Sequence, residues 1–288
     1  MTAAPSRIGR LSRFSLTTAD ARRAAQFFEA AFGCRQIATD RLSGPNFERL
    51  MDVKGGADRI SLGLGREVID LVQFDILGEP YPRGRSASDL VFQHFAIVVA
   101  NMQLAFLRLS SVAGWTPITR DGPQRLPASS GGVTAFKFRD PEGHPLELLA
   151  FKKGDGSIWQ AASRDETSLG IDHSAISISD SAVSIAFYES VGLGVSARSF
   201  NHGSAQEKLD DVSGAQVEVT ALAPRRHTPH LELLCYRTVE QRPKPVRKAN
   251  DIASTCLIFD PWKAPNAAGG RTAARSMHDP DGHALLIS

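Results

Sequence analysis

The sequence predicts an α+β fold of four tandem modules, each reading strand, helix, strand, strand, strand, with the last module truncated. Three observations lead to this prediction. A block of motifs recurs about 160 residues further along the chain. A turn motif, Asp-Pro-acid-Gly-His, closes each half. Apolar residues at helical spacing follow three Asp or Asn residues, between segments that read as strands.

The repeat is carried by segments that occur in the same order in both halves. A Phe-Phe-Glu run begins at Phe27, seven residues after Asp20, and a Phe-Tyr-Glu run begins at Phe187, seven residues after Asp180. Two further pairs of segments correspond: Glu48–Val53 with Glu207–Val212, and Ile69–Phe74 with Leu231–Tyr236. We therefore expect two domains related by duplication, 1–153 and 168–288.

The strands are clearest around the turn that closes each half, Asp140–His144 and Asp279–His283. In this motif proline fixes φ, and glycine accepts the positive φ that a hairpin reversal needs. The flanking segments 133–138 and 146–151 alternate or remain apolar, as strands do. Each half therefore ends in a predicted hairpin.

Three helices are predicted, each directly after Asp20, Asn101 or Asp180. An Asp or Asn before an apolar run is an N-cap signal, because its side chain accepts from free backbone N–H groups. The apolar residues at helical spacing are Ala24, Phe27, Phe28 and Ala31, then Leu104, Leu107 and Leu109, then Ile185 and Tyr188.

These elements define modules at 9–75, 90–152, 170–237 and 250–288. The fourth is short, because only 18 residues separate Asp260 from Asp279, whereas 38 separate Asn101 from Asp140. That distance leaves no room for a full helix and a second strand, so the fourth module is predicted to be truncated.

The composition is that of a globular protein, with 42% hydrophobic and 22% charged residues. The 33 basic and 31 acidic residues are mixed along the chain, which excludes the basic clustering that nucleic-acid binding needs. Three cysteines in no recognisable spacing argue against a disulfide framework. Neither a secretory signal nor a membrane helix is predicted, so we expect a cytoplasmic location.

Two strands carry a resemblance to a known family. Gln93–Val99 contains His94 and Ile171–Ile178 contains His173, and each is followed downstream by a Leu-Glu-Leu-Leu strand. With four module signals in order, nearly the whole chain resembles the vicinal oxygen chelate superfamily, which includes glyoxalase I, bleomycin resistance proteins and extradiol ring-cleaving dioxygenases. The resemblance implies cup-shaped mixed β-sheets with helices outside, and metal ligands on the first and last strands of each module.

The resemblance assigns ligand positions module by module. The first-strand positions are Arg13, His94, His173 and, depending on alignment, Ala253 or Cys256; the last-strand positions are Asp70, Glu147, Glu232 and Leu286. Modules two and three thus keep a complete His and Glu pair. Imidazole and carboxylate groups suit Zn, Fe, Ni or Mn ions, and the sequence does not indicate which of these ions binds. The alternative is that both histidines are hydrogen-bonded core residues and both glutamates pair with arginines.

Two module pairings remain open. If modules two and three pair, the metal ligands are His94, Glu147, His173 and Glu232, the two-His, two-Glu set of glyoxalase I, and this is the set we favour. If modules one and two pair, the set is Asp70, His94 and Glu147.

Five further residues have roles to weigh. Arg13 either binds a substrate carboxylate or pairs with Asp70, and His202 is a candidate substrate-binding residue on a Gly-containing loop. His230 is either a ligand or an edge residue. His144 and His283, within the turn motifs, are expected to be structural.

The function implied is metal-dependent chemistry on a small substrate with neighbouring oxygens, with Glu147 and Glu232 as catalytic carboxylates. Isomerase or lyase chemistry of the glyoxalase type is favoured. The alternatives are an Fe(II) extradiol-type dioxygenase and a non-catalytic binding or resistance protein. The expected partner is a small molecule, neither nucleic acid nor membrane, and a homodimer is left open.

Overall fold

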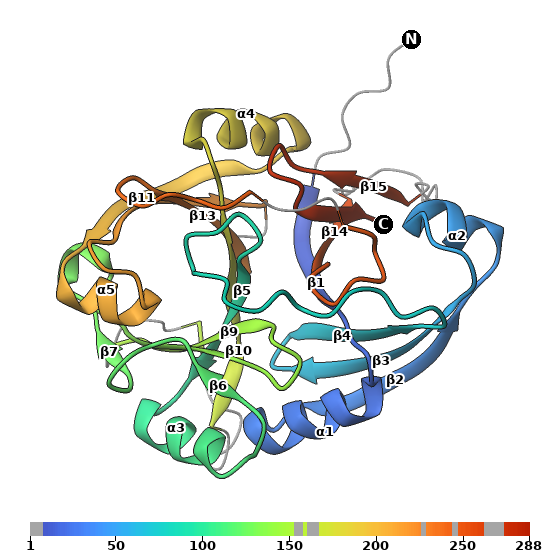
Figure 1. Cartoon of the computed structure of the whole chain (residues 1–288), viewed down its shortest axis with the longest axis horizontal. Coiled ribbons are helices and arrows are strands. Elements are labelled where there is room, and N and C mark those ends of the chain that lie inside the picture. Colours follow the sequence, from blue (N-terminus) through green and yellow to red (C-terminus); the bar gives the residue numbers. More distant parts are fainter. Residues whose placement is uncertain (1–7, 153–157, 160–166, 226–228, 244–246, 262–273) are drawn as a thin grey trace.

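The computed structural model describes residues 8–152, 158–159, 167–225, 229–243, 247–261 and 274–288. Two mixed β-sheets stand side by side in the molecule (Figure 1). The first sheet has the strand order β15-β16-β14-β1-β4-β3-β2. Its strands are β1 (Ile8–Thr17), β2 (Arg35–Leu42), β3 (Ala57–Leu64), β4 (Glu67–Phe74), β14 (Cys256–Pro261), β15 (Arg275–His278) and β16 (Ala284–Ile287).

The second sheet has the order β11-β12-β13-β10-β5-β9-β8-β6, with β7 paired to β8. Its strands are β5 (Gln93–Val99), β6 (Thr116–Pro117), β7 (Gln124–Arg125), β8 (Thr134–Arg139), β9 (Pro145–Ala150), β10 (Ser168–Ser177), β11 (Gly194–His202), β12 (Gln216–Ala223) and β13 (His230–Tyr236). Each sheet therefore joins strands from the first half of the chain to strands from the second. That 1–153 and 168–288 fold as two separate domains stays a prediction.

The predicted α+β fold of βαβββ modules is confirmed. The three predicted helices are α1 (Ala21–Phe32), α3 (Met102–Ser110) and α4 (Ser181–Val191), and Asp20, Asn101 and Asp180 cap them as expected. Two short helices, α2 (Pro45–Met51) and α5 (Ser204–Asp210), lie at corresponding places in the repeat and were not predicted. Among the described residues of the fourth module there are strands only, and 262–273 lie outside the described residues.

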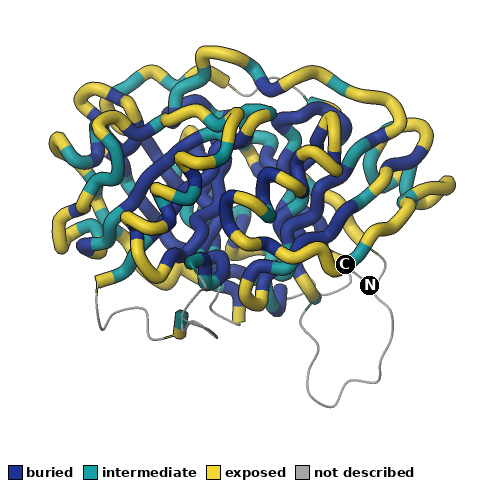
Figure 2. The backbone as a smooth tube through the Cα atoms, turned by 90° about the horizontal axis from the view of Figure 1, so that it is seen from below, coloured by how far each residue is buried: buried dark blue, intermediate teal, exposed yellow. Residues whose placement is uncertain are grey.

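One hydrophobic core joins the two sheets. It contains Phe14 of β1, Phe28 of α1, Phe95 of β5 and Phe259 of β14, all at most 1% exposed. The buried strands run through the middle of the molecule, and exposed residues lie on the outer loops and outer helix faces (Figure 2). Because strand side chains alternate between faces, the residues between these core positions face the opposite side of each sheet.

The two Asp-Pro-acid-Gly-His turns hold one sheet against the other. His144 Nε2 donates to the carbonyls of Thr17 and Ile252, at 3.0 and 2.9 Å. His283 Nε2 contacts the carbonyl of Ser177 at 3.0 Å. Both histidines thus bond the main chain of the neighbouring module, as a structural role requires.

Among the described residues, no helix combines the length and apolar character needed to cross a membrane.

Candidate metal centre

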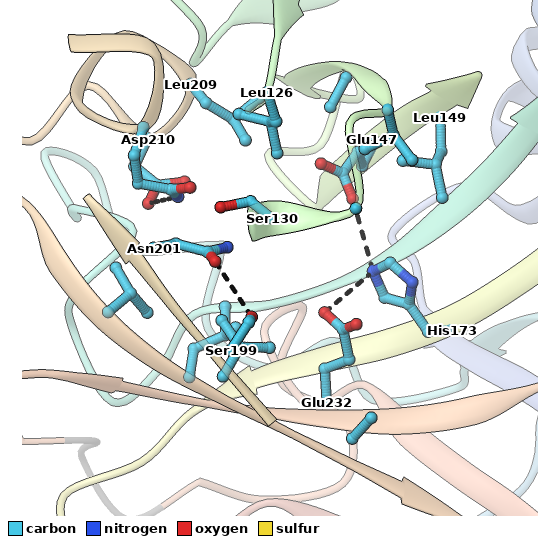
Figure 3. Close-up of a pocket in the computed structure, with 18 of the residues that line it drawn as sticks. Leu126, Ser130, Glu147, Leu149, His173, Ser199, Asn201, Leu209, Asp210 and Glu232 are labelled. Carbon is cyan, nitrogen blue, oxygen red and sulfur yellow. Dashed lines mark hydrogen bonds and ion pairs between the residues drawn. The ribbon is translucent and has the colours of Figure 1, made fainter. Parts of the chain in front are cut away.

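A cavity of about 380 Å³ lies on the face of the second sheet opposite the core. Strands β5, β8, β9, β10, β11, β12 and β13 and helix α5 contribute residues to its lining, and Figure 3 shows a close-up of it. Leu126, Leu149 and Leu209 give it an apolar wall, while Ser130, Ser199 and Asn201 add polar groups.

Strand register brings four predicted residues to this cavity, one of which is His173, two residues before Ala175 on β10. Ala175 of β10 pairs with both His94 of β5 and Glu232 of β13, so all three face one side. Glu147 of β9 pairs with Ala96 of β5, two residues beyond His94. Both alanines are fully buried and small, which leaves space above the sheet for the longer imidazole and carboxylate groups.

Three of the four side chains, those of His94, Glu147 and His173, have ligand atoms that all lie within 4.8 Å of one another, and Glu232 adjoins this group through His173. Glu147 Oε2 lies 3.3 Å from His94 Nε2 and 3.5 Å from His173 Nε2. His173 Nε2 lies 3.6 Å from Glu232 Oε2. These separations exceed an ordinary N–H···O hydrogen bond of about 2.9 Å. They match the edge of about 3.4 Å between two ligand atoms that each lie about 2.1 Å from a tetrahedral ion.

The charge states also suit a cation. Burial alone raises the pKa of Glu147, but contacts with His173 and His94 outweigh it and hold the pKa well below its usual range. Burial likewise opposes ionisation of Glu232, yet His173 and His230 lower its pKa to about 2. Burial, with Lys137 nearby, lowers the pKa of His94, which favours the neutral imidazole that a metal needs.

His173 is oriented by a neighbour that the sequence analysis did not single out. Its Nδ1 lies 2.9 Å from Asp172 Oδ2, which directs Nε2 toward the glutamates. A carboxylate on the far nitrogen is the usual support of a metal-bound histidine. This carboxylate and Glu232 outweigh burial and raise the pKa of His173, so an incoming ion would displace a proton there. His94 Nδ1 has no hydrogen-bond partner among the described residues.

His230 lies at the edge of this group. Its Nε2 is 3.4 Å from Glu232 Oε1, and its ring centroid is 5.3 Å from that of His173. The side chain is 19% exposed, whereas that of His94 is 1% exposed.

Arg13 and Asp70 lie in the first sheet, away from the cavity. Arg13 Nη1 is 2.8 Å from Asp70 Oδ1, and Ser61 donates to the same oxygen at 2.6 Å. Of the two roles left open for Arg13, the structure thus shows the ion pair. Ser15 pairs in register with Asp70 and with Cys256, just as Ala175 pairs with Glu232 and with His94 in the second sheet. Cys256, rather than Ala253, therefore holds the position in the first sheet that His94 holds in the second.

His202 ends β11 beside Arg125, Lys152 and Ser204, in a separate shallow hollow. It does not line the cavity that holds the four candidate ligands.

Sequence analysis missed four buried polar residues that line the cavity: Lys137, Gln206, Asp210 and Tyr236. A signal existed for Lys137, because it stands between Phe136 and Phe138 in an alternating strand. It must therefore face away from the core, beside its register partner Glu147. No local sequence pattern marked Asp210, whose ion-pair partner Lys137 comes from another module.

Comparison with known proteins identifies the fold. No family model matches the sequence, and no curated protein matches it. A point variant of glyoxalase I from Zea mays is 19% identical, with a TM-score of 0.60 over 96% of this chain and 91% of that one. Glyoxalase I from Zea mays itself is 18% identical, with a TM-score of 0.58 over 96% and 91%. A candidate dioxygenase from Bacillus subtilis subsp. subtilis str. 168 is 12% identical, with a TM-score of 0.57 over 98% and 85%. The chain therefore has the vicinal oxygen chelate fold, as its sequence indicates.

Proposed function

We propose that this protein is a metal-dependent enzyme that acts on a small substrate with two neighbouring oxygen atoms. Its ion would be held by His94, Glu147, His173 and Glu232. The observation that carries the proposal is the convergence of two imidazoles and two carboxylates, with N···O separations of 3.3–3.6 Å. The fold shared with glyoxalase I supports a reaction of the isomerase or lyase type.

A bound divalent ion would supply Lewis acidity to the two substrate oxygens. The chain's own residues would do the rest. Glu232 is the more exposed carboxylate, at 24% against 6% for Glu147, so it has room to take a proton from the substrate. Glu147, buried between both histidines, would stay in place. The apolar wall would exclude water from the substrate.

One observation favours a second chemistry. His94, Glu147 and His173 form a group without Glu232, with all three ligand atoms within 4.8 Å of one another. Two histidines and one carboxylate with open positions are the ligand set of Fe(II) oxygenases. An extradiol-type dioxygenase is therefore the alternative, supported also by the fold shared with the Bacillus subtilis protein. A protein that only sequesters a ligand in the cavity would not need the ion.

Elemental analysis of the purified protein tests the proposal, with about one divalent ion expected per chain. Two single variants then identify the ligands. Glu232→Gln should weaken metal binding strongly, because it removes a charged ligand. Asp70→Asn should leave metal binding unchanged, because Asp70 pairs with Arg13 in the other sheet. The opposite pattern, or full metal content in a His94→Ala and Glu147→Ala double variant, would refute this site.

Two expectations about the whole protein belong to the same proposal. No disulfide joins Cys34, Cys235 and Cys256, all of which the structure describes, and this suits a reducing cytoplasm. A homodimer stays a prediction, which light scattering of the purified protein would test.

A further inference from the structure

A second group of buried polar side chains shares the cavity with the candidate ligands. Lys137 Nζ lies 2.6 Å from Asp210 Oδ1. The other carboxylate oxygen, Asp210 Oδ2, accepts from Gln206 Nε2 at 2.6 Å and from the Tyr236 hydroxyl at 2.8 Å. None of the four residues is more than 5% exposed. Burying an ion pair costs free energy that two apolar residues would not, so the stability of the fold alone does not explain this group.

Gln206, which lines the cavity, has an unused hydrogen-bond acceptor. Its amide orientation is fixed, because the Nε2 donor must face the Asp210 carboxylate. The carbonyl oxygen Oε1 is buried and has no hydrogen-bond partner among the described residues. An unpaired buried acceptor is costly, which indicates that a ligand atom completes it.

Lys137 supplies a donor on the other oxygen of the carboxylate that Gln206 contacts. Its ammonium carries three N–H groups, and Asp210 accepts one of them. Lys137 also pairs in register with Glu147, so it stands between the candidate metal ligands and Asp210. Figure 3 shows Asp210 across the cavity from His173 and Glu232, with Leu126 and Leu209 beside it. A molecule held at the four ligands would therefore extend toward this group.

We propose that Lys137 and Gln206, positioned by Asp210, recognise a neutral polar group of the substrate that both accepts and donates a hydrogen bond, such as a carboxamide or a hydroxyl. The inference rests on the proposed function, because it places the substrate's two neighbouring oxygens at the four ligands. Lys137 donates to the oxygen of this group, and Gln206 Oε1 accepts its N–H or O–H. A carboxylate fits poorly, because Asp210 already neutralises Lys137 and Gln206 Oε1 repels a second acceptor.

The test uses the full chain loaded with metal and three short hydroxamates of matched length, which end in a methyl group, a carboxamide or a carboxylate. A hydroxamate offers two neighbouring oxygens to the ion, so all three probes share that contact. Calorimetric titration should show the carboxamide binding at least about tenfold more tightly than the other two. Equal or tighter binding of the carboxylate would overturn the recognition site and leave the metal centre standing. Failure of all three probes to bind would overturn the proposed function, and this inference with it.

Variants of Gln206, Lys137 and Asp210 test which residues give the carboxamide preference. Gln206→Met should remove most of the carboxamide preference at unchanged metal content. Gln73→Met is the matched control in β4, where Gln73 accepts from the backbone of Ala21 far from the cavity, and it should keep the preference. Should Gln206→Met fail to fold, Lys137→Met combined with Asp210→Leu replaces the ion pair by apolar residues, a change that proteins often tolerate. That double variant should prefer the methyl probe. A carboxamide preference that survives in folded variants of the group would refute the assignment.

Discussion

Asp172 would support the proposed metal centre through another residue, His173. It contacts His173 Nδ1 at 2.9 Å, so it sets the ring orientation and leaves Nε2 for the ion. Its position next to His173 in sequence concealed this role, because adjacent residues of a regular strand face opposite sides. Here the pairing of β10 with β5 shifts register between Ile171 and Ser174, which lets both side chains reach the cavity.

Asp172→Asn should therefore lower metal affinity by about 10- to 100-fold without loss of fold. The amide cannot stabilise the ring proton as a carboxylate does, so His173 becomes a weaker ligand. Competition with a coloured chelator measures the affinity. Asp121→Asn, in an exposed loop, is the matched control and should bind metal as the unchanged protein does. Equal affinities in the two variants would contradict the orienting role.

His144 is a second residue whose charge can be inferred from its partners. Nδ1 faces Asp140 Oδ2 at 2.8 Å, and Nε2 faces two carbonyl oxygens. Carboxylate and carbonyl oxygens only accept, so both ring nitrogens carry a proton. Burial lowers the pKa of His144, but Asp140 raises it by more, and the net pKa lies above its ordinary value of 6.5.

This raised pKa predicts how stability depends on pH. The unfolded chain loses the proton near pH 6.5, while the folded chain keeps it to higher pH. The stabilisation from His144 is therefore complete below pH 6.5 and is lost as the pH rises through the folded pKa. Urea unfolding across this range should show the decline in the unchanged protein. His144→Gln, which is never charged, should show less of it, and identical profiles would disprove the imidazolium.

Among the elements, the closing turns cap the helices of neighbouring modules. Glu142 accepts from the backbone N–H groups of Ala19 and Asp20, at the start of α1. Asp281 accepts from the N–H of Ser179, just before α4. The duplication thus preserves one contact twice, between a turn carboxylate and the free N–H groups ahead of a helix.

Glu142→Ala should lower the free energy of unfolding by about 1–2 kcal/mol, because it leaves helix-end donors unpaired. Asp281→Ala should cost less, because it removes one hydrogen bond where Glu142 makes several. Glu189→Ala, on the exposed face of α4, serves as the control and should change little. Chemical denaturation measures all three. A cost for Glu189→Ala equal to that for Glu142→Ala would show that the caps contribute nothing specific.

Elements set by local chemistry could be predicted from the sequence, and elements set by distant contacts could not. The N-caps of α1, α3 and α4 and the turn at Gly143, whose φ is +99°, follow from residues next to one another. Helices α2 and α5 were missed because each has only 7 residues, and α2 has no buried residue at all. The candidate ligands were found because the resemblance to the vicinal oxygen chelate superfamily assigns ligands to the first and last strands of each module. The pair of Lys137 and Asp210 was not found, because neither residue stands at a ligand position of the superfamily and their contact joins two modules.

At the scale of the molecule, each sheet combines the two halves of the chain. The first sheet pairs β1 with β14, and the second pairs β5 with β10, both antiparallel. Sequence analysis weighed two pairings for the metal site, because module spacing alone does not decide which strand edges meet. The arrangement places every His and Glu candidate in one sheet, while the first sheet holds Arg13, Asp70, Cys256 and Leu286 at the corresponding positions.

This shared architecture predicts that the chain unfolds as one unit. Leu285 of β16 is 1% exposed in the core that also contains Phe95 and Leu148 of the sheet with the candidate ligands. Leu285→Ala should lower the free energy of unfolding by about 2–5 kcal/mol, through lost burial and the cavity left behind. It should leave the metal affinity of the folded protein unchanged, because the candidate metal centre lies in the other sheet.

Because an ion bound to the native state alone raises its stability, added metal should raise the melting temperature of the variant and of the unchanged protein alike. Circular dichroism and metal release, followed together during heating, should report the same single transition in both proteins. Two transitions, with 1–153 and 168–288 melting separately, would instead support the halves as independent domains. Metal release that precedes the loss of structure in Leu285→Ala alone would show that the first sheet helps to shape the metal centre.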